Sequence, residues 1–593
     1  GSFKSTNGNF TLDSTGNIAL KASTFSAQQG TARMQADGSI DLGYIQGPPT
    51  AITQTQTDTL QSGQMLAGGC AEQGQGDSAQ TICTSDQWLV PQIDKTTTTS
   101  TTQDGFNGTL VQGQQIQIEA GQNLNITASE LQSVGNIDLR ADGNVTIAAA
   151  VGQVQTTHTQ TTNTTSTVQV VDGTGDNASY STATQTTGQT VTETTNGQFV
   201  QGSSITSAQG TVRVKSGADM AIDSSALQGE QGVALLSAGD LNIGGQHLKG
   251  QSTERKPATA GQQATTTAKE TQTFAGSTIS SGSGSVSAVA LGDVSVSGST
   301  LAAEQNINLI GDSVSVKAQV NTTESLETQG NPNGGRHWQT TDKQTQTLAG
   351  GKVEAGQDIN VIAGMSADLG YQVGLLASPT SALPERSASA NSGNITLSGA
   401  QLSAGTPGSQ KAGQVNLLAQ GDIDIGTVEL VNKSDTFKFD KSSNTGGNST
   451  ITQHTITETH TQVGTSMSAD QINVAAGGDL NMTGSAVSAA GDVNLAATGN
   501  VTIQAATNTE TKYTEDSNRS SGITGSGSFG IHIGSSSQKS QAWLDATSQS
   551  QGMSLVGSTE GDVRIVAGKT YTQQGSDVLT PQGDIAILAK SVN

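Results

Sequence analysis

A short unit recurs along most of the chain and constrains the fold more than any other feature. It is a glycine, then Asp, Asn or Gln, then an apolar, a polar and an apolar residue, as in GNIDLRADG from Gly135, GNVTIAAA from Gly143, GDLNIGG from Gly239 and GDVNLAATG from Gly491. Alternation with a period of two indicates strands that bury one face. Runs of about five residues are too short for an amphipathic helix. The unit therefore predicts many short strands.

The spacing of the units predicts how the strands are arranged. Gly113 and Gly135 are 22 residues apart, and so are Gly561 and Gly583. A coil of this length with two or three short strands is typical of a solenoid, in which each strand pairs with its equivalent one coil away at about 4.8 Å. The predicted fold class is all-β, a right-handed parallel β-helix (solenoid). Roughly 15 coils would make a rod on the order of 70 Å.

The composition fits such a coil better than it fits a globular enzyme. Only 32% of residues are hydrophobic and 3% are aromatic, while Gly accounts for 74 of 593. A narrow coil needs only two inward residues per strand, such as Ile116 with Ile118 or Val493 with Leu495. The corner glycine is expected to allow a positive φ, and the following Asp or Asn is expected to hydrogen-bond within its own turn.

The recurring Asp residues could also be calcium ligands or catalytic acids. They do not follow the nine-residue Gly-Gly-x-Gly-x-Asp calcium repeat. Asn or Gln takes the same place at Asn136, Asn144 and Gln357. The turn role is therefore the favoured interpretation.

Between the coils lie longer segments rich in Thr and Gln, which start near Gln153, Gln251, Gln319, Thr452 and Thr507. Alternating Thr around turn residues is the pattern of two antiparallel strands closing on a turn. These segments are predicted to be β-hairpins extruded from the β-helix about once every two coils. They could cover the side of the helix and its sheet edges, or form a contact surface, since loops on a repeat scaffold often carry binding.

The predicted organisation has three parts: first β-helix coils over 1–43, a disulfide-containing insert over 44–104, and a β-helix of ~22-residue coils with periodic hairpins over 105–593. The insert is the least repetitive segment and contains Pro48, Pro49 and Trp88. Cys70 and Cys83, the two cysteines of the chain, are predicted to form a disulfide in an oxidising compartment. Closing a loop of about 14 residues would stabilise the insert by roughly 3 kcal/mol in the chain-entropy model.

Charge and hydropathy exclude several classes of function. The net charge of −23 makes nucleic-acid binding unfavourable. No stretch approaches the ~18 consecutive apolar residues of a membrane-spanning helix. The start of the chain lacks a basic-then-apolar signal, which led us to expect an internal fragment.

The residues that could carry chemistry are few and scattered. Histidines cluster only in HTITETH, where His454, Glu458 and His460 share a strand face. At ~3.3 Å per residue, the two histidines lie too far apart to hold one ion, so no metal site is expected. No nucleophile motif or phosphate-binding loop is present, and no catalytic residue or cofactor site is predicted. A carbohydrate-processing β-helix enzyme remains the least favoured alternative, because β-helices can carry carboxylates along one groove.

One long stretch resembles a known family. The run GDVNLAATGNVTIQAATNTETKYTED from Gly491, then SGITGSGSFGIHIGSSSQKS and STEGDVRIVAGKTYTQQGSDV, resembles the haemagglutinin repeats of filamentous haemagglutinin and of contact-dependent growth inhibition (CdiA-like) exoproteins. The resemblance implies a very long Gram-negative exoprotein at the cell surface, secreted through an outer-membrane partner of a two-partner system. It also implies a possible toxin at the far C-terminus of the parent chain.

The expected function is therefore a rigid β-helical stalk fragment, not an enzyme, that takes part in cell-cell contact and toxin delivery to neighbouring bacteria. The alternative is a host- or matrix-binding adhesin module. The expected partners are the two-partner transporter, acting on the parent chain, and a receptor or the outer membrane of a neighbouring cell. We expect a monomer that can associate end to end, because terminal coils expose strand edges.

Overall fold

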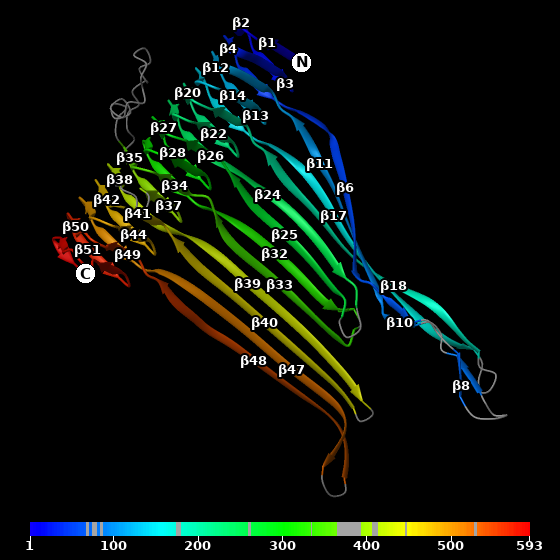
Figure 1. The fold of residues 1–593 in the computed structure, drawn as a ribbon. Coiled ribbons are helices and arrows are strands. Elements are labelled where there is room, and N and C mark those ends of the chain that lie inside the picture. The colour runs from blue at the N-terminus through cyan, green and yellow to red at the C-terminus, as the bar shows by residue number, and fades with distance from the viewer. Residues whose placement is uncertain are drawn as a thin grey trace.

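The computed structural model describes residues 1–66, 70–73, 80–83, 87–172, 179–258, 263–333, 335–364, 393–405, 413–444, 447–526 and 530–593. These residues form strands joined by turns and bends, and no helix among them has the length and hydropathy to cross a membrane. Two parts can be distinguished in Figure 1: a body of stacked short strands, and long hairpins that project from one side of it.

The body is a parallel β-helix whose coils each contain three short strands. We call these the first, second and third faces, in chain order. Within the described residues, thirteen consecutive parallel pairings connect fourteen strands along each face, so the body has fourteen coils. At about 4.8 Å per coil, it is roughly 60 Å long. The predicted fold class is thus confirmed as a parallel β-helix with extruded hairpins.

The strands of each face are as follows. The first face contains β1 (Ser2–Ser5), the beginnings of β4 (Thr24–Ala36) and β12 (Leu110–Ala120), β14 (Glu130–Ser133), β19 (Ser204–Ser207), β22 (Ala226–Gly229), β26 (Thr278–Ser281), β29 (Thr300–Ala303), β34 (Lys352–Ala355), β37 (Gln401–Ala404), β41 (Ser466–Ala469), β44 (Ala486–Ala489), β49 (Leu555–Ser558) and β52 (Asp577–Leu579). The second face contains β2 (Phe10–Ser14), the ends of β4 and β12, β15 (Ile137–Ala141), β20 (Thr211–Ser216), β23 (Gly232–Ser237), β27 (Ser285–Ala290), β30 (Ile307–Gly311), β35 (Ile359–Ala363), β38 (Gln414–Ala419), β42 (Gln471–Ala476), β45 (Val493–Ala497), β50 (Val563–Ala567) and β53 (Ile585–Leu588). The third face contains β3 (Ile18–Lys21), β5 (Ile40–Gly43), β13 (Leu124–Thr127), β16 (Val145–Ala148), β21 (Met220–Asp223), the beginning of β24 (Leu241–Lys256), β28 (Val294–Ser297), β31 (Val314–Lys317), β36 (Ile395–Ser398), the beginning of β39 (Ile423–Asn444), β43 (Leu480–Thr483), β46 (Val501–Gln504), β51 (Thr570–Gln574) and β54 (Ser591–Val592).

The core of the body is a column of aliphatic side chains supplied by all three faces. The inward residues predicted from the period of two, Ile116 with Ile118 and Val493 with Leu495, are buried. Their neighbours in the column are the equivalent residues one coil away: Ile116 pairs with Ile137, for example. Each strand contributes little apolar area, and the stack as a whole forms one continuous core.

The first face was not recognised from the sequence. Its strands carry one large inward residue followed two positions later by Ser, Ala or Gly, as in Leu131 followed by Ser133. A strand with a single apolar residue gives a weak period-two signal. The recurring small residue after it was the signal that could have identified this face.

The corner residues work differently from the local turn that the sequence predicted. Asp219 Oδ1 accepts the main-chain N–H of Asp240, 2.9 Å away and one coil further on, and Asp240 Oδ1 in turn accepts that of Asp293. The side chains thus tie one coil to the next. Gly239 does not adopt a positive φ. It is needed because a Cβ there would overlap Asp219 Oδ1 of the preceding coil.

The corner between the third and first faces carries a ladder of buried hydroxyl groups. The single proton of the Ser277 hydroxyl points toward the carbonyls of Ile222 and Gly244, which lie 3.0 and 2.8 Å from Oγ, and Oγ accepts the N–H of Ser225 at 3.2 Å. Buried hydroxyl groups take the equivalent place at Thr109, Ser129, Ser203, Ser225, Ser299, Thr465, Ser485 and Ser554, and all of these except Thr109 accept a main-chain N–H from the neighbouring coil. This ladder satisfies buried main-chain groups at the corner from which the hairpins leave.

Six hairpins, which we call arms, leave the body at this corner. They follow the third-face strands β5, β16, β24, β31, β39 and β46, which means one arm after every second coil, and β24 and β39 run on into their arms without a break. The arms are β6 (Ile45–Gln61) with β11 (Gln92–Asn107), β17 (Ala150–Asp172) with β18 (Ser179–Gln201), β24 with β25 (Thr265–Gly276), β32 (Gln319–Gly330) with β33 (His337–Ala349), β39 with β40 (Gly447–Gly464), and β47 (Ala506–Ser526) with β48 (Gly530–Gly552). Four further short strands, β7 (Gln64–Leu66), β8 (Cys70–Gln73), β9 (Gln80–Cys83) and β10 (Gln87–Val90), extend the first arm.

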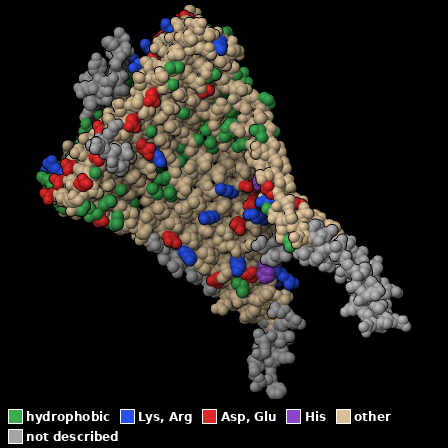
Figure 2. Space-filling model, viewed as in Figure 1, with side chains coloured by type: hydrophobic (Ala, Val, Ile, Leu, Met, Phe, Trp, Pro, Cys, Tyr) green, Lys and Arg blue, Asp and Glu red, His purple; other side chains and the backbone are tan. Residues whose placement is uncertain are grey.

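The two ends of the body differ. At the first coil, Phe3 stacks on Phe25 with ring centroids 5.1 Å apart, and Phe10 packs beside both rings. At the last coil, Ile585 and Ile587 continue the core column but are partly exposed. Hydrophobic side chains are visible at the surface at this end (Figure 2).

Candidate interaction surface

The six arms pair with one another and form a single antiparallel sheet, which we call the arm sheet. Its strand order is β6-β11-β17-β18-β24-β25-β32-β33-β39-β40-β47-β48, and five pairings between arms, which we call seams, hold it together. The arms project away from the body instead of lying over its side (Figure 1). Of the two roles expected for the hairpins, a cover for the helix is therefore not what the structure shows.

The continuity of the arm sheet follows from matching spacings. Neighbouring strands of a sheet lie about 4.8 Å apart, and so do neighbouring coils of a β-helix. One arm supplies two strands and leaves after every second coil, so each arm occupies the same width in the sheet as its two coils occupy in the body. Any other ratio would leave gaps between the arms or crowd them.

The arm sheet is a single layer, and this separates it from the body. Along β40 the side chains are intermediate or exposed, and along β6 nearly all are exposed. Large apolar side chains such as Ile52 and Leu326 point into solvent. Cross-strand contacts therefore stabilise this sheet in place of a core.

Each seam ends on the body side in a hydrogen bond from a main-chain N–H to a side chain of the neighbouring arm. In the seam between β33 and β39, Asn432 Oδ1 accepts the N–H of Gln346 at 2.9 Å, and Gln346 Oε1 accepts that of Val431 at 2.7 Å. The acceptors of the other four seams are Asp104, Gln198, Asn321 and Asn508. These side chains continue the seam past its last main-chain pair, which gives the abundant Asn and Gln of the arms a structural role.

An aromatic ladder crosses three neighbouring arms. Trp338 on β33 stacks with Phe437 and Phe439 on β39, at centroid distances of 5.2 and 5.6 Å. Phe437 contacts His454 on β40, which contacts Tyr513 on β47, at 5.8 and 5.7 Å. All five rings are half-buried. Because the rings stack on one another, the ladder strengthens both seams that it crosses.

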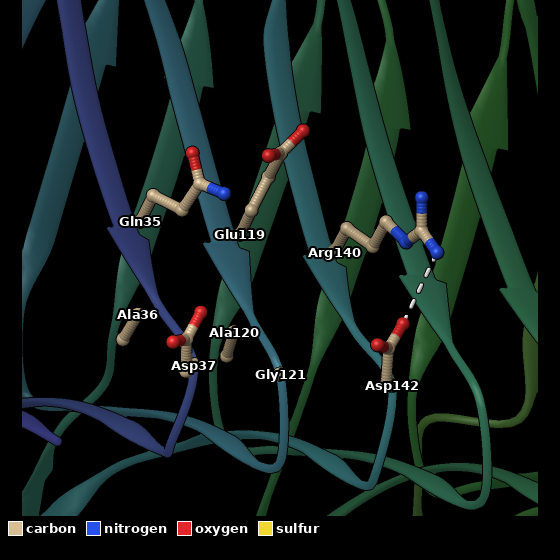
Figure 3. Close-up of a pocket in the computed structure, with 8 residues that line it drawn as sticks. All are labelled: Gln35, Ala36, Asp37, Glu119, Ala120, Gly121, Arg140 and Asp142. Carbon is tan, nitrogen blue, oxygen red and sulfur yellow. Dashed lines mark hydrogen bonds and ion pairs between the residues drawn. The ribbon is translucent and has the colours of Figure 1, made fainter. Parts of the chain in front are cut away.

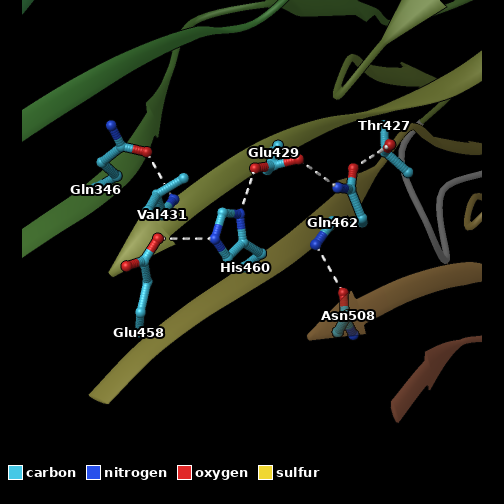
Figure 4. Close-up of polar contacts among 8 residues, drawn as sticks. All are labelled: Gln346, Thr427, Glu429, Val431, Glu458, His460, Gln462 and Asn508. Atoms are coloured by element: carbon cyan, nitrogen blue, oxygen red, sulfur yellow. Dashed lines mark hydrogen bonds and ion pairs between the residues drawn. The ribbon is translucent and has the colours of Figure 1, made fainter. Parts of the chain in front are cut away.

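The histidines of HTITETH lie against carboxylates of the β39–β40 arm. His454 Nε2 lies 2.8 Å from Asp435. His460 lies between two carboxylates, with Nδ1 2.6 Å from Glu429 and Nε2 3.0 Å from Glu458 (Figure 4). Among the residues that the structure describes, no group of His, Cys, Asp and Glu has the geometry of a metal site. The sequence missed Glu429 and Asp435, because only the pairing of β39 with β40 brings them opposite these histidines.

The bridge between His460 and Glu429 shifts the pKa values of both residues. Hydrogen bonds to Glu429 and then Glu458 raise the pKa of His460 above its usual value, and the bond from His460 holds the pKa of Glu429 below its usual value. Asp440 lies on β39 of the same arm. A hydrogen bond from His337 on the neighbouring strand β33, and a second one from Lys438, lower the pKa of Asp440. The side chains of the His460 bridge are a third or more exposed, so the energies involved are modest.

The predicted disulfide lies at the far end of the first arm. The main chains of β8 and β9 pair in antiparallel register with Cys70 opposite Cys83. The side chains of both cysteines, and that of Trp88, are outside the described residues, so the disulfide itself stays a prediction. The side chain of His532 is not described either.

The enzyme alternative requires carboxylates gathered in a groove, and a hollow at a corner of the body contains several. It has a volume of about 420 Å³ and contains Asp37, Glu119, Asp142 and Arg140 (Figure 3). Arg140 lies 3.1 Å from Asp142, and Arg33 lies 3.6 Å from Glu119, with all four side chains about half exposed. Carboxylates that are solvated and paired with arginines form ordinary surface ion pairs.

Comparison with known proteins agrees with this architecture. The model of the hemagglutinin repeat family matches residues 92–256 and 444–593, together more than half of the chain. Both segments contain body coils with their arms. No solved structure matches the chain.

Several curated relatives share part of the chain. The 16S rRNA endonuclease CdiA of Enterobacter cloacae is 35% identical over 207 residues, which is 34% of this chain and 6% of that protein. The tRNA nuclease CdiA of Escherichia coli O6:K15:H31 is 41% identical over 143 residues, 24% of this chain and 4% of that protein. The deoxyribonuclease CdiA of Dickeya dadantii is 32% identical over 212 residues, 33% of this chain and 6% of that protein.

The chain thus spans only a small fraction of the length of these relatives. Their nuclease names describe whole proteins of which it matches a few per cent. What is shared with the family model is the sequence of the repeat region. The chain belongs to the haemagglutinin-repeat family, in its filamentous haemagglutinin and CdiA-like form.

Proposed function

We propose that this chain is a non-enzymatic stalk segment of a contact-dependent growth inhibition exoprotein. In this proposal the parent chain is secreted through an outer-membrane two-partner transporter, stands at the surface of a Gram-negative bacterium and delivers a C-terminal toxin to a neighbouring cell. The observation that carries it is the unbroken body of fourteen coils, whose continuous main-chain ladders make a stiff spacer.

The test shortens the stalk without disturbing its fold. Deletion of residues 203–276 removes two coils together with one arm, and joins Gly202 to Ser277, which occupies the same ladder position as Ser203. Repeated whole-unit deletions in the parent exoprotein should reduce the killing of neighbouring cells in co-culture while secretion and surface display stay normal. Killing that is independent of stalk length would contradict a role in reach.

The insert over 44–104 supports a second candidate function, adhesion. It contains the first arm and the additional strands β7 to β10, which the other arms lack among the described residues. As a receptor contact, the insert would be stabilised by the Cys70–Cys83 disulfide. The antiparallel pairing that places Cys70 opposite Cys83 supports this disulfide. Removal of the insert should abolish cell binding if it contacts the receptor or the outer membrane of the neighbouring cell. Unchanged binding would assign the contact to another part of the stalk.

We also propose weak end-to-end association through the terminal coils. The exposed apolar residues of the last coil, among them Ile585 and Ile587, support it. Light scattering at increasing concentration would show a rise in mass that the substitution Ile587→Lys suppresses. A constant mass would rule this mode out.

A further inference from the structure

We propose that the outer half of β18 is a docking edge that accepts an extended peptide segment of a partner protein as an added antiparallel strand. β18 pairs with β17 over its whole length, but with β24 only from Thr192 to Gly197. Among the described residues, no strand pairs with residues 179–191 on the β24 side. We call residues 183–191 the open edge. Every second main-chain N–H and C=O group along it faces outward and can pair with another strand.

The open edge results from unequal arm lengths in the interior of the arm sheet. β24 ends at Lys256, and the next residue, Pro257, has no N–H with which to continue the pairing. The third and fourth arms end at the same level, because Lys256 pairs with Thr265 and Thr265 pairs with Gln329. The second arm runs on beyond these tips (Figure 1). The place beside β18 that a longer β24 would occupy therefore suits a strand from another molecule.

Two other seams show how the arms close such an edge elsewhere. The seam between β33 and β39 begins at His337, the first residue of β33. The seam between β40 and β47 begins at Gly447, the first residue of β40. In both, the pairing reaches the tip of an arm, whereas the pairing of β18 with β24 stops at Thr192 and leaves the outer half of β18 without a neighbour on that side.

The open edge lacks the residues that usually protect the edge of a sheet. Exposed edges are commonly blocked by proline or by charged side chains, above all lysine. Residues 183–191 contain no proline and no charged residue. An uncharged edge of this kind binds an extended peptide mainly through main-chain hydrogen bonds, with side-chain pockets supplying the specificity.

The threonines of the open edge favour threonine in the added strand. The hydroxyl groups of Thr190 and Thr186 lie 3.2 and 3.3 Å from those of Thr161 and Thr165 on β17. Such hydroxyl pairs between facing strands are stabilising. A peptide with threonine opposite Thr190 and Thr186 would extend both rows by one strand.

A second hollow lies at the root of the open edge and favours a basic residue. Its volume is about 400 Å³, and Gln189, Val191, Glu193, Glu254 and Lys256 contribute to its lining. Glu193 lies directly opposite Glu254 across the seam, and facing like charges destabilise a sheet. Lys256 Nζ lies 3.1 Å from Glu254 Oε1, which leaves Glu193 as the carboxylate that an incoming cation can neutralise.

The register of the seam shows where the peptide should carry this cation. Arg255 pairs with Thr192, so the first positions beyond Lys256 in the same line lie opposite Thr190 and then Gln189. Gln189 is on the same face of β18 as Val191 and Glu193, because alternate residues of a strand share a face. A lysine or arginine opposite Gln189 therefore projects on the side of the hollow. The expected ligand is an extended, otherwise uncharged peptide with a basic residue at its second position.

A synthetic peptide tests the main-chain part of the proposal. The probe is acetylated and amidated Thr-Lys-Thr-Gln-Thr-Val-Thr-Gln, titrated into the whole chain in a calorimeter. Hydrogen exchange should show new protection of amides in residues 183–191. Two further peptides carry N-methyl groups at the odd or at the even positions. One of them should bind and the other should not, because only alternate N–H groups of an added strand face β18.

Charge changes test the basic position. The substitution Glu193→Gln should weaken binding of the lysine peptide by up to about fivefold, and a peptide with glutamate in place of lysine should bind less tightly to the wild type. Glu327→Gln is the matched control. Glu327 lies on the same face as Glu193, in the same row of paired residues but three strands away, and its substitution should leave binding unchanged.

Each remaining outcome overturns the proposal. If the lysine peptide does not bind, or if it protects amides away from the open edge, β18 is not a docking edge. Equal binding by both methylated peptides, or by neither, would contradict pairing along one side of the added strand. If the lysine and glutamate peptides bind alike, or if Glu193→Gln has no effect, the hollow does not select a basic residue.

Discussion

The body and the arm sheet are built from strands of the same chain, yet they are stabilised in different ways. In the body, the strands between the two terminal coils bury apolar residues in a shared core, and Asp, Asn and Ser side chains tie each coil to the next. The arm sheet has no core, and hydroxyl pairs, aromatic stacking and His–carboxylate bridges span its strands. Burial thus fixes the body, whereas the body fixes the arm sheet by setting the spacing of its arms.

The largest effect should come from breaking the match between coils and arms. Deletion of residues 204–225 removes one coil and no arm. It joins Ser203 to Ala226, which is the partner of Ser204 one coil away. The arms on either side would then be one coil apart, which is too close for two strands each. We expect the seam of Thr192–Gly197 with β24 to lose its protection in amide hydrogen exchange while the body amides keep theirs.

The whole-unit deletion 203–276 is the matched control, because it preserves the ratio of two strands to two coils. The arm sheet should then close again between β18 and β32, and their amides should be protected. Loss of protection in both deletions would show that spacing does not determine the continuity of the sheet.

The second largest effect should be the difference in stability that truncating an apolar side chain causes in the body and in the arm sheet. Ile222 is fully buried on the third face, and Ile222→Ala should lower the stability of the surrounding coils by about 2–5 kcal/mol because it leaves a cavity. Val191 lies half-buried in the single-layer sheet, and Val191→Ala should cost less than about 1 kcal/mol. Hydrogen exchange near each site measures both effects, and equal costs would mean that the arm sheet has a covered face.

Removing one hydroxyl group should also cost more stability in the body than in the arm sheet, although this difference is smaller. Ser277→Ala removes the hydroxyl that lies against the carbonyls of Ile222 and Gly244 and accepts the N–H of Ser225 inside the body. It should destabilise the neighbouring coils by about 1–3 kcal/mol because buried groups lose their partners. Thr161→Ala removes an exposed contact to the hydroxyl of Thr190, where water can replace the lost partner. Thermal unfolding should therefore shift for the serine variant and hardly at all for the threonine variant.

The smallest effect concerns pH, and it should be confined to the arm sheet. The raised pKa of His460 gives stability that is complete below its usual pKa of about 6.5 and lost as pH rises through the raised value. The lowered pKa of Glu429 gives stability that is present above its usual pKa of about 4.3 and lost as pH falls through the lowered value. The bridge is therefore strongest in mildly acidic solution.

Amides of the β39–β40 arm should accordingly be best protected at that pH, by at most about 1 kcal/mol because the groups are well exposed to solvent. The variant His460→Gln should flatten the profile, and high salt should weaken it. A profile that is unchanged by His460→Gln would assign the pH dependence to other groups.

Much of the body could be predicted from the sequence, and little of the arm sheet. The period of two identified inward residues such as Ile116 and Val493, and the 22-residue spacing identified the coil. The first face was missed because Leu131 and its equivalents stand alone on their strands. The corner Asp residues were recognised as structural, but their partners one coil away, as for Asp219 and Asp240, follow only from the stacking.

The sequence by itself therefore determined the coil, because an alternating apolar pattern specifies which face of each strand is buried, and a regular repeat makes equivalent residues meet. Only the tertiary structure decided that the arms merge into one sheet. A strand of Thr and Gln is polar on both faces, so its pattern does not choose its neighbour. The choice is made by the body, which places one two-stranded arm every two coils at the strand spacing of a sheet.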